Sequence, residues 1–227
     1  GSEAATAVTT ADDITAIGRS CLAACTTGDS NTALGSKSLM ANTTANNNTA
    51  VGFQALTANT TGDHNVALGY NAALANTTGR NNVSVGANTL TSNTTGQKNV
   101  SLGNSTLESA TTADKNTAIG NSALNNTTTG ANNTAVGDSA LVSNTTGNNN
   151  TAVGTNALDA ATTVSHNTAF GYDAGTDTTG GQNTFLGSTT GVQITSGTNN
   201  VHVGYDIGHA GNISNSIGIG RNLTLLG

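Results

Sequence analysis

The chain has 227 residues, of which 8% are charged, and its formal net charge is −6. Its six Lys and Arg residues are scattered and form no basic stripe, which excludes nucleic acid and anionic membranes as expected partners. With 29 Gly, three Phe, three Tyr, no Pro and no Trp, the chain also lacks the large side chains of an ordinary globular core.

Residues 1–13 precede the first repeat and are expected to form a lead-in, in which Gly1 and Ser2 look like a vector remnant. No charged segment followed by an apolar one opens the chain, and no run approaches about 18 apolar residues, so we expect no membrane insertion. Cys21 and Cys25 follow in the first coil, where other coils carry Ala or Ser and then Asn. We expect two small buried thiols, with a disulfide or redox pair as the alternative.

Residues 14–187 form a strict repeat, because a glycine closes a short apolar segment at regular intervals. These glycines, counted as position 0 of each coil, are at 18, 35, 52, 69, 86, 103, 120, 137, 154, 171, 187, 204 and 220. The nine steps from Gly18 to Gly171 are equal in length and define a 17-residue repeat. Such a period predicts one unit stacked on itself, so we expect an all-β fold: a parallel β-solenoid, or β-roll, of about 13 coils.

Each coil is predicted to contain two short strands separated by turns. Positions −3 to −1, as in Thr49-Ala50-Val51, are rich in β-branched residues and end in an apolar one, which is typical of a strand. The Ala-Leu pair at +3 and +4, as in Ala55-Leu56, predicts the second strand. Positions +7 to +10 then read Asn-Thr-Thr-Gly, as in 59–62, which predicts a turn.

Two columns of identical residues are predicted to be structural. Asn at position −4 can pass amide hydrogen bonds from coil to coil, and glycine at position 0 is needed where the chain turns too tightly for a Cβ atom. The predicted asparagine ladder is Asn31, Asn48, Asn65, Asn82, Asn99, Asn116, Asn133, Asn150 and Asn167, continued by Asn183 and Asn200. The predicted glycine column is Gly35, Gly52, Gly69, Gly86, Gly103, Gly120, Gly137 and Gly154.

The strand that ends at position −1 is apolar on both of its faces, since positions −3 and −1 lie on one face and position −2 on the other. A single roll can enclose only one of these faces. We therefore expect the other face to be covered by further copies of the chain, in a parallel homo-oligomer whose coils are in register.

The pattern becomes irregular near the end, and residues 188–227 are expected to form irregular coils or a cap. After Gly171, the steps to Gly187 and from Gly204 to Gly220 are each one position shorter than the regular step, and four of the six aromatic residues lie from Phe170 onward. A wider core explains this structurally; a contact surface for a receptor or glycan is the functional alternative. That surface would include the aromatic residues at position +1: Phe53, Tyr70, Tyr172 and Tyr205.

The repeat 48–52, Asn-Thr-Ala-Val-Gly, followed by Ala-Leu and Asn-Thr-Thr-Gly, resembles the repeats in the shafts of phage tail fibres. Its first half is similar to the Ser-Val-Ala-Ile-Gly signature of trimeric autotransporter adhesin heads, most closely at 216–220. The resemblance covers roughly residues 14–220. It implies a left-handed roll, a homotrimer, and a non-enzymatic structural or adhesive segment that extends and presents a surface-binding module. The implied location is extracellular, on a virion tail fibre or a bacterial surface, with a host-cell receptor or glycan as partner.

Catalytic and cofactor-binding residues are not evident. The acidic residues look dispersed, so we expect no catalytic carboxylate pair, no calcium ladder and no cofactor. Asp63 and Arg80 share a column one coil apart and are expected to form an exposed ion pair. His202 stands where most coils carry Ala; on a threefold axis, three copies of it could hold a metal ion, and the alternative is a tolerated polar residue.

Two other functions remain open from the sequence. The segment 51–56 fits the hexapeptide pattern of acyltransferases with a left-handed β-helix, but only one hexad in three fits, and no substrate loop interrupts the spacing. The paired Thr residues of the turns, such as Thr60 and Thr61, keep an ice-binding solenoid open.

Overall fold

The computed structural model describes residues 1–209 and 212–225, and among them it has β-strands and turns but no helix. The chain divides into two compact units, residues 1–115 and 116–227. The strands of the first unit are β1 (Thr15–Ile17), β2 (Thr32–Leu34), β3 (Thr49–Val51), β4 (Val66–Leu68), β5 (Val83–Val85) and β6 (Val100–Leu102). Those of the second are β7 (Thr117–Ile119), β8 (Thr134–Val136), β9 (Thr151–Val153), β10 (Thr168–Phe170), β11 (Thr184–Leu186), β12 (Val201–His209) and β13 (Ile217–Leu225).

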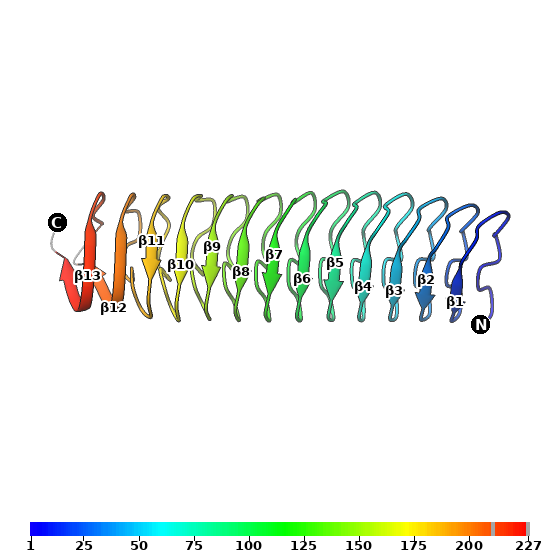
Figure 1. Cartoon of the computed structure of the whole chain (residues 1–227), viewed down its shortest axis with the longest axis horizontal. Helices are drawn as coiled ribbons and strands as arrows, with labels where there is room; N and C mark the ends of the chain where they lie inside the picture. The colour runs from blue at the N-terminus through cyan, green and yellow to red at the C-terminus, as the bar shows by residue number, and fades with distance from the viewer. Residues whose placement is uncertain (210–211, 226–227) are drawn as a thin grey trace. The chain divides into compact units, whose positions relative to one another are not determined.

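Within each unit, every strand pairs in parallel with the strands before and after it in the chain (Figure 1). The register joins the same repeat position of neighbouring coils, as Ala33 pairs with Ala50 and Ala50 with Ala67. In the second unit the step between β10 and β11 is one position shorter, since Thr168 pairs with Thr184. The predicted all-β parallel solenoid with a 17-residue repeat is therefore confirmed.

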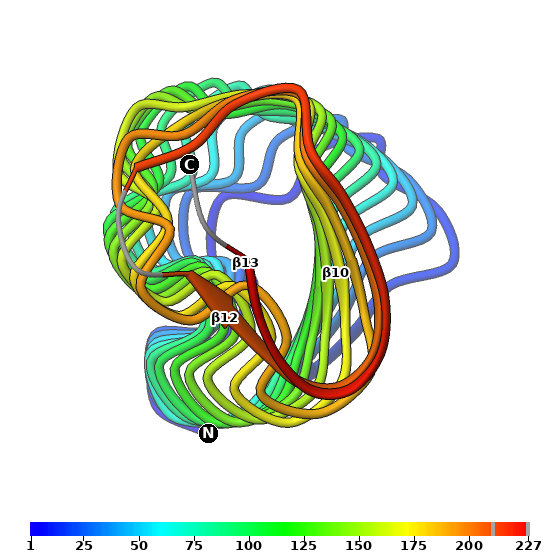
Figure 2. The ribbon, with the colours of Figure 1, turned by 90° about the vertical axis from the view of Figure 1, so that its left-hand side faces the viewer.

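The second unit winds left-handed. In Figure 1 the arrow of β10 points downward on the near face, and in Figure 2, seen from the C-terminal side, β10 lies on the right. The chain therefore turns clockwise while it advances toward the viewer, which is a left-handed path. The hand implied by the resemblance is thus found in this unit, and the number of chains in the assembly stays a prediction.

The predicted second strand is wrong. The Leu at position +4 has left-handed backbone geometry in every coil that carries it, with φ between 48° and 54°, and position +2 is left-handed as well, as in Gln54 (φ 58°). These residues still bond from coil to coil, as the Leu39 N–H donates to the Ala55 carbonyl at 3.0 Å. Left-handed geometry costs about 1–2 kcal/mol per residue, but it turns each Leu into the core, where burial contributes about 1.5–3 kcal/mol.

The core of each unit is a thin column of small residues and leucines. Position −2 of the strand faces inward and is fully buried from Ala33 onward, as are all the Leu at position +4. Cys21 and Cys25 belong to this core in the first unit. Figure 2 shows the coils of the second unit closing around this narrow interior.

The predicted asparagine ladder is buried and hydrogen-bonded inside both units. In the first unit, the backbone N–H of Asn82 donates to the amide oxygen of Asn65 at 3.0 Å, and the N–H of Asn99 donates to that of Asn82 at 3.0 Å. The Asn82 amide nitrogen donates to the Gly96 carbonyl of the next turn at 2.8 Å. Each Asn therefore supplies the acceptor for a buried backbone N–H of the following coil and one of the two donors to the turn carbonyl of that coil, since Gly96 also accepts from Asn93 at 3.1 Å.

Replacing one rung should expose this double role. Asn82→Ala leaves the Asn99 N–H without its acceptor, which costs about 1–3 kcal/mol, and removes one of the two donors to the Gly96 carbonyl, which costs about 1 kcal/mol, so we expect a loss of about 2–4 kcal/mol. Asn82→Asp keeps the acceptor and lacks the donor. Urea denaturation should rank wild type above both variants. A loss below about 1 kcal/mol for Asn82→Ala would contradict the ladder.

A second amide column was not predicted, because Asn-Thr-Thr-Gly was interpreted only as a turn. In the first unit, Asn42, Asn59, Asn76 and Asn93 at position +7 point inward and are fully buried. We call these four residues the inner amide ladder. The amide nitrogens of Asn59, Asn76 and Asn93 donate to the amide oxygen of the preceding coil, at 3.1, 2.8 and 2.7 Å. The signal was present in the sequence, since Asn recurs at +7 with the same period as at −4.

The glycine column is required by close approach of neighbouring coils. Gly69 has a φ of 139°, and a Cβ atom there would overlap the carbonyl oxygen of Gly86 in the next coil. The same overlap with the next glycine is found at Gly35, Gly52 and Gly137. The glycines thus allow neighbouring coils to stack at strand distance in the corner of the roll.

Candidate interaction surface

The outward face of the strands carries uncharged aliphatic and Thr side chains, exposed or half-buried, in both units. Positions −3 and −1 point away from the core, and we call these residues the outer stripe. In the first unit the stripe consists of Thr15, Ile17, Thr32, Leu34, Thr49, Val51, Val66, Leu68, Val83, Val85, Val100 and Leu102. In the second it consists of Thr117, Ile119, Thr134, Val136, Thr151, Val153, Thr168, Phe170, Thr184, Leu186, Val201, Val203, Ile217 and Ile219.

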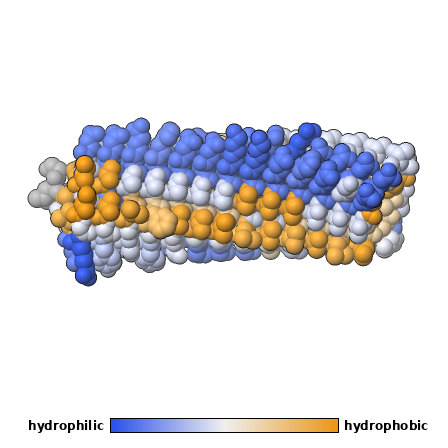
Figure 3. Space-filling view, in the orientation of Figure 1, coloured by the Kyte–Doolittle hydropathy of each residue, from blue (hydrophilic) through white to orange (hydrophobic). Residues whose placement is uncertain are grey.

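Large aliphatic side chains of the stripe are well exposed: Ile17 is 59%, Leu34 44% and Leu102 44% exposed in the first unit. None of the stripe residues is charged. Position −3 changes along the first unit from Thr in β1–β3 to Val in β4–β6, whereas it is Thr throughout β7–β11 of the second. Figure 3 shows the stripe as a band of hydrophobic colour on the strand face. Contiguous exposed apolar surface of this kind marks an interaction site.

The predicted contact residues at position +1 are all exposed. Phe53 and Tyr70, on successive coils of the first unit, stack with ring centroids 5.7 Å apart and planes 10° from parallel. In the second unit, the Arg221 guanidinium lies 5.5 Å from the centroid of the Tyr205 ring. Tyr172 is 55% exposed. A hydrogen bond to Asp173 and the negative charge of that carboxylate raise the pKa of the Tyr172 hydroxyl.

His202 does not face a possible threefold axis, and this prediction is corrected. It occupies position −2, where the strand faces its own core, and its side chain is fully buried. The imidazole packs against the Phe185 ring at 5.7 Å, and its Nε2 lies 3.3 Å from the Ser216 hydroxyl. Copies of the chain could not bring three such side chains together without opening the coil.

Phe185 accounts for the glycines that replace Leu at position +4 in two of the last coils. It takes the place of Ala at position −2 and is fully buried. The coil before it and its own coil both carry glycine at +4 instead of Leu, namely Gly175 and Gly191. A Cβ atom on Gly175 would lie 2.6 Å from the Phe185 ring, and one on Gly191 would also overlap it. The structural explanation, a core refilled by one large residue, is thus supported for Phe185.

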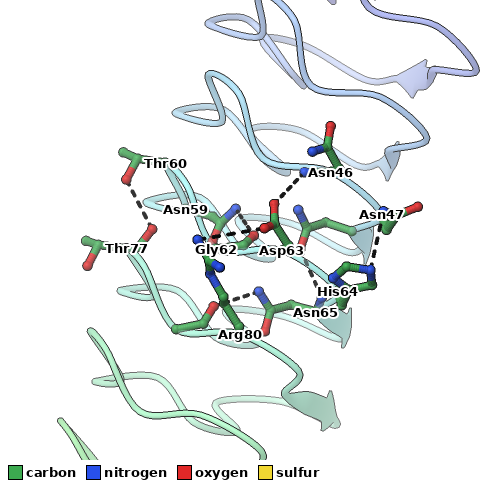
Figure 4. A network of polar contacts seen from close by, with 12 residues as sticks. Asn46, Asn47, Asn59, Thr60, Gly62, Asp63, His64, Asn65, Thr77 and Arg80 are labelled. Carbon is green, nitrogen blue, oxygen red and sulfur yellow. Dashed lines mark hydrogen bonds and ion pairs between the residues drawn. The ribbon is translucent and has the colours of Figure 1, made fainter.

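The turn residues form polar contacts on the surface of the first unit (Figure 4). The Asp63 carboxylate accepts a hydrogen bond from the Asn46 N–H at 2.9 Å and lies 3.8 Å from the Arg80 guanidinium, which confirms the predicted pair. His64 Nε2 lies 3.4 Å from the Asn47 amide. The Thr60 hydroxyl donates to the Thr77 carbonyl of the next coil at 3.1 Å. These contacts hold turns together and assemble no reactive group.

The acidic residues are less dispersed than expected, because Asp12 and Asp29 share a column and the charges of Asp173 and Asp177 act on Asp159. The Asp29 carboxylate accepts a hydrogen bond from the Asp12 N–H at 2.9 Å. Among the described residues, no three His, Cys, Asp or Glu side chains lie together as a metal ion requires, and no pocket is found. No helix of the described chain is long and apolar enough to cross a membrane.

Cys21 and Cys25 are free and buried, which fits the expectation of two small core thiols. The Cys21 thiol donates to the Gly18 carbonyl at 3.2 Å, and burial raises its pKa. Both effects favour the unreactive protonated form. A thiol reagent at pH 8 should therefore label the folded chain about 100-fold more slowly than the urea-unfolded chain, which corresponds to an opening free energy of about 3 kcal/mol. Rapid labelling in the folded state would show that the first coil opens.

No family model, curated protein or solved structure matches this chain. The solenoid, its ladders and the outer stripe therefore stand on the structure of the chain itself.

Proposed function

We propose that this chain is a non-enzymatic structural segment of a homotrimeric fibre. Its role is to extend and present a surface-binding module, in a phage tail fibre or a bacterial surface adhesin, outside the cell. The observation that carries the proposal is the outer stripe, whose aliphatic side chains are exposed or half-buried in coil after coil without a charge among them.

The free energy gained by burying the outer stripe is large enough to drive association of several copies of the chain. Burying one exposed aliphatic side chain contributes up to about 1.5–3 kcal/mol. Six strands of the first unit each offer one at position −1. Together they are of the same order as the free energy that association costs in lost freedom, roughly 4–15 kcal/mol. A partner with the same 17-residue repeat meets every coil equally, and another copy of this chain has that repeat.

The aromatic residues at position +1 support a contact role beside the stripe. Phe53, Tyr70, Tyr172 and Tyr205 are 42–55% exposed, and such side chains supply contact area at low entropic cost. In the fibre they are the candidates for contact with a host-cell receptor or glycan. The Asn side chains of most Asn-Thr-Thr sequons, such as Asn59 and Asn76, are fully buried and cannot carry a glycan, whereas Asn126 is exposed.

Sedimentation velocity and light scattering test the proposal. We expect a trimer for the wild-type chain and a folded monomer for the triple variant Leu34→Lys, Leu68→Lys and Leu102→Lys, which places three charges in the outer stripe. The matched control, Thr27→Lys, Thr61→Lys and Thr95→Lys, adds the same charge at exposed turn positions and should stay trimeric. A folded, monomeric wild-type chain with its stripe in water would overturn the fibre.

Ice binding is the second candidate, because Thr at position −3 forms a regular outward column on the strand face. Thr117, Thr134, Thr151, Thr168 and Thr184 repeat from β7 to β11, beside the apolar column at −1. A monomer that shows thermal hysteresis would support this function in place of the fibre. Binding of acetyl-CoA would instead support an acyltransferase.

A further inference from the structure

The inner amide ladder of the first unit is a chain of aligned amides with one unsatisfied end. Every amide nitrogen in it donates toward the N-terminal side, so every amide oxygen is available to the following coil. Asn93 is the last rung. Its amide oxygen is buried and has no hydrogen-bond partner. Aligned hydrogen bonds polarise one another, so this oxygen is a strong acceptor in a low-dielectric interior.

The following coil carries Ala110 where the ladder would place another Asn. The backbone is the same at both positions, because the N–H of Asn93 donates to the Leu90 carbonyl at 3.3 Å and that of Ala110 to the Leu107 carbonyl at 3.2 Å. Neighbouring turns are held at ordinary distance, as the Thr94 N–H donates to the Thr111 carbonyl at 2.8 Å. The coils therefore cannot close over the space that a carboxamide occupies elsewhere.

The turn carbonyl of the coil that contains Ala110 also has one hydrogen-bond donor fewer than in an intact rung. In an intact rung, the turn carbonyl accepts from two amides: Gly79 accepts from Asn76 at 3.0 Å and from Asn65 at 2.8 Å. The corresponding carbonyl of Ala113 accepts from the Asn99 amide at 2.7 Å, and Ala110 has no amide to supply the second bond. The missing NH2 group would have donated to both the Asn93 oxygen and the Ala113 carbonyl.

The second unit repeats this arrangement independently. Asn144 donates its amide nitrogen to the Thr127 hydroxyl at 3.2 Å, and its buried amide oxygen has no partner. The next coil carries the fully buried Ala161, and the Val164 carbonyl accepts from Asn150 at 2.8 Å. One coil further, the buried hydroxyl of Thr178 also has no partner.

We propose that each of these two ladder breaks is a binding site for a buried water molecule that takes the place of the missing NH2 group. The water donates one hydrogen bond to the Asn93 amide oxygen and one to the Ala113 carbonyl. In the second unit it donates to the Asn144 oxygen and the Val164 carbonyl. A buried water needs two to four polar partners, and at each break the amide oxygen and the turn carbonyl supply two of them.

A high-resolution crystal structure of the whole chain tests both sites. We expect ordered solvent within hydrogen-bond distance of the Asn93 and Asn144 amide oxygens. Ala110→Asn should remove the first water and leave the second, and Ala161→Asn should do the reverse, so each variant contains its own control. Asn42, which occupies the same position before Ala45, shows that the coil has room for the carboxamide that Ala110→Asn introduces.

Thermal unfolding gives a second readout. Ala110→Asn should raise Tm by about 2–4 °C, since a direct bond replaces an immobilised water. Ala123→Asn, at a buried position with no ladder, should lower Tm. The absence of electron density for a water molecule at both sites of the wild-type chain would overturn the proposal. It would also be overturned if the introduced Asn side chains of the two variants did not donate to the Asn93 and Asn144 amide oxygens.

Discussion

Gly69→Ala is expected to destabilise the first unit by about 3–5 kcal/mol. The added Cβ atom would overlap the Gly86 carbonyl oxygen, which is backbone and cannot rotate away. At the same time, alanine would have to adopt a φ of 139°. Overpacking costs about 1–3 kcal/mol and such a backbone conformation a further 1–3 kcal/mol. Urea denaturation monitored by circular dichroism should show a lower midpoint, or a first unit that does not fold.

Gly208→Ala is the matched control for this prediction. Gly208 lies in β12, and a Cβ atom there would meet the Val192 carbonyl oxygen at 3.6 Å, an ordinary contact. We expect a change within about 0.5 kcal/mol, as for substitutions that disturb no packed feature. Equal losses of unfolding free energy in the two variants would mean that close approach of neighbouring coils is not the reason for glycine at position 0.

The sequence predicts the solenoid because its evidence is redundant: the same columns recur in coil after coil. The asparagine ladder and the glycine column were predicted for the same reason, since a residue type that recurs with a fixed period must meet its own kind in the next coil. Position −1 could also be assigned to an outward face, because the strand has only two faces and the small residue at −2 fits the inside of a tight roll.

The second strand could not be predicted from composition, because Ala-Leu carries no sign of left-handed backbone geometry. Leu at a positive φ is strained in isolation, and only burial in the finished roll offsets this cost. His202 was misplaced for a related reason. The metal hypothesis required position −2 to face a threefold axis, whereas the register with Phe185 and the burial of His202 place it on the inward face.

The packing around Phe185 could have been predicted from the sequence by comparing positions −2 and +4 of successive coils. Alanine at −2 gives way to Phe185 in the coil where +4 becomes Gly191, and the preceding coil has Gly175 at +4. Taken separately, the Phe at −2 and the two Gly at +4 look like departures from the repeat. Taken together they exchange volume between neighbouring positions, as close-packed cores require.

The exchange of side-chain volume between Phe185 and the two glycines can be tested by substitution. Phe185→Ala should lower the free energy of unfolding by about 3–5 kcal/mol, because it removes a fully buried ring whose space the two glycines cannot fill. Gly191→Leu alone should also destabilise, since its Cβ atom would overlap the Phe185 ring. The triple variant Phe185→Ala, Gly175→Leu and Gly191→Leu restores the residues of the regular coils, such as Ala135 with Leu141, and should recover most of the loss.

Urea denaturation of the wild type, the three single variants Phe185→Ala, Gly175→Leu and Gly191→Leu, and the triple variant measures this coupling. Residues that share one packed space show interaction energies of about 0.5–3 kcal/mol. A positive coupling of that size means that Phe185 and the two glycines form one packing unit. If the losses in stability simply add, the glycines at +4 are not there to make room for Phe185. The change in sequence after Gly171 would then have to be explained by contacts on the surface, where Tyr172 and Tyr205 are exposed.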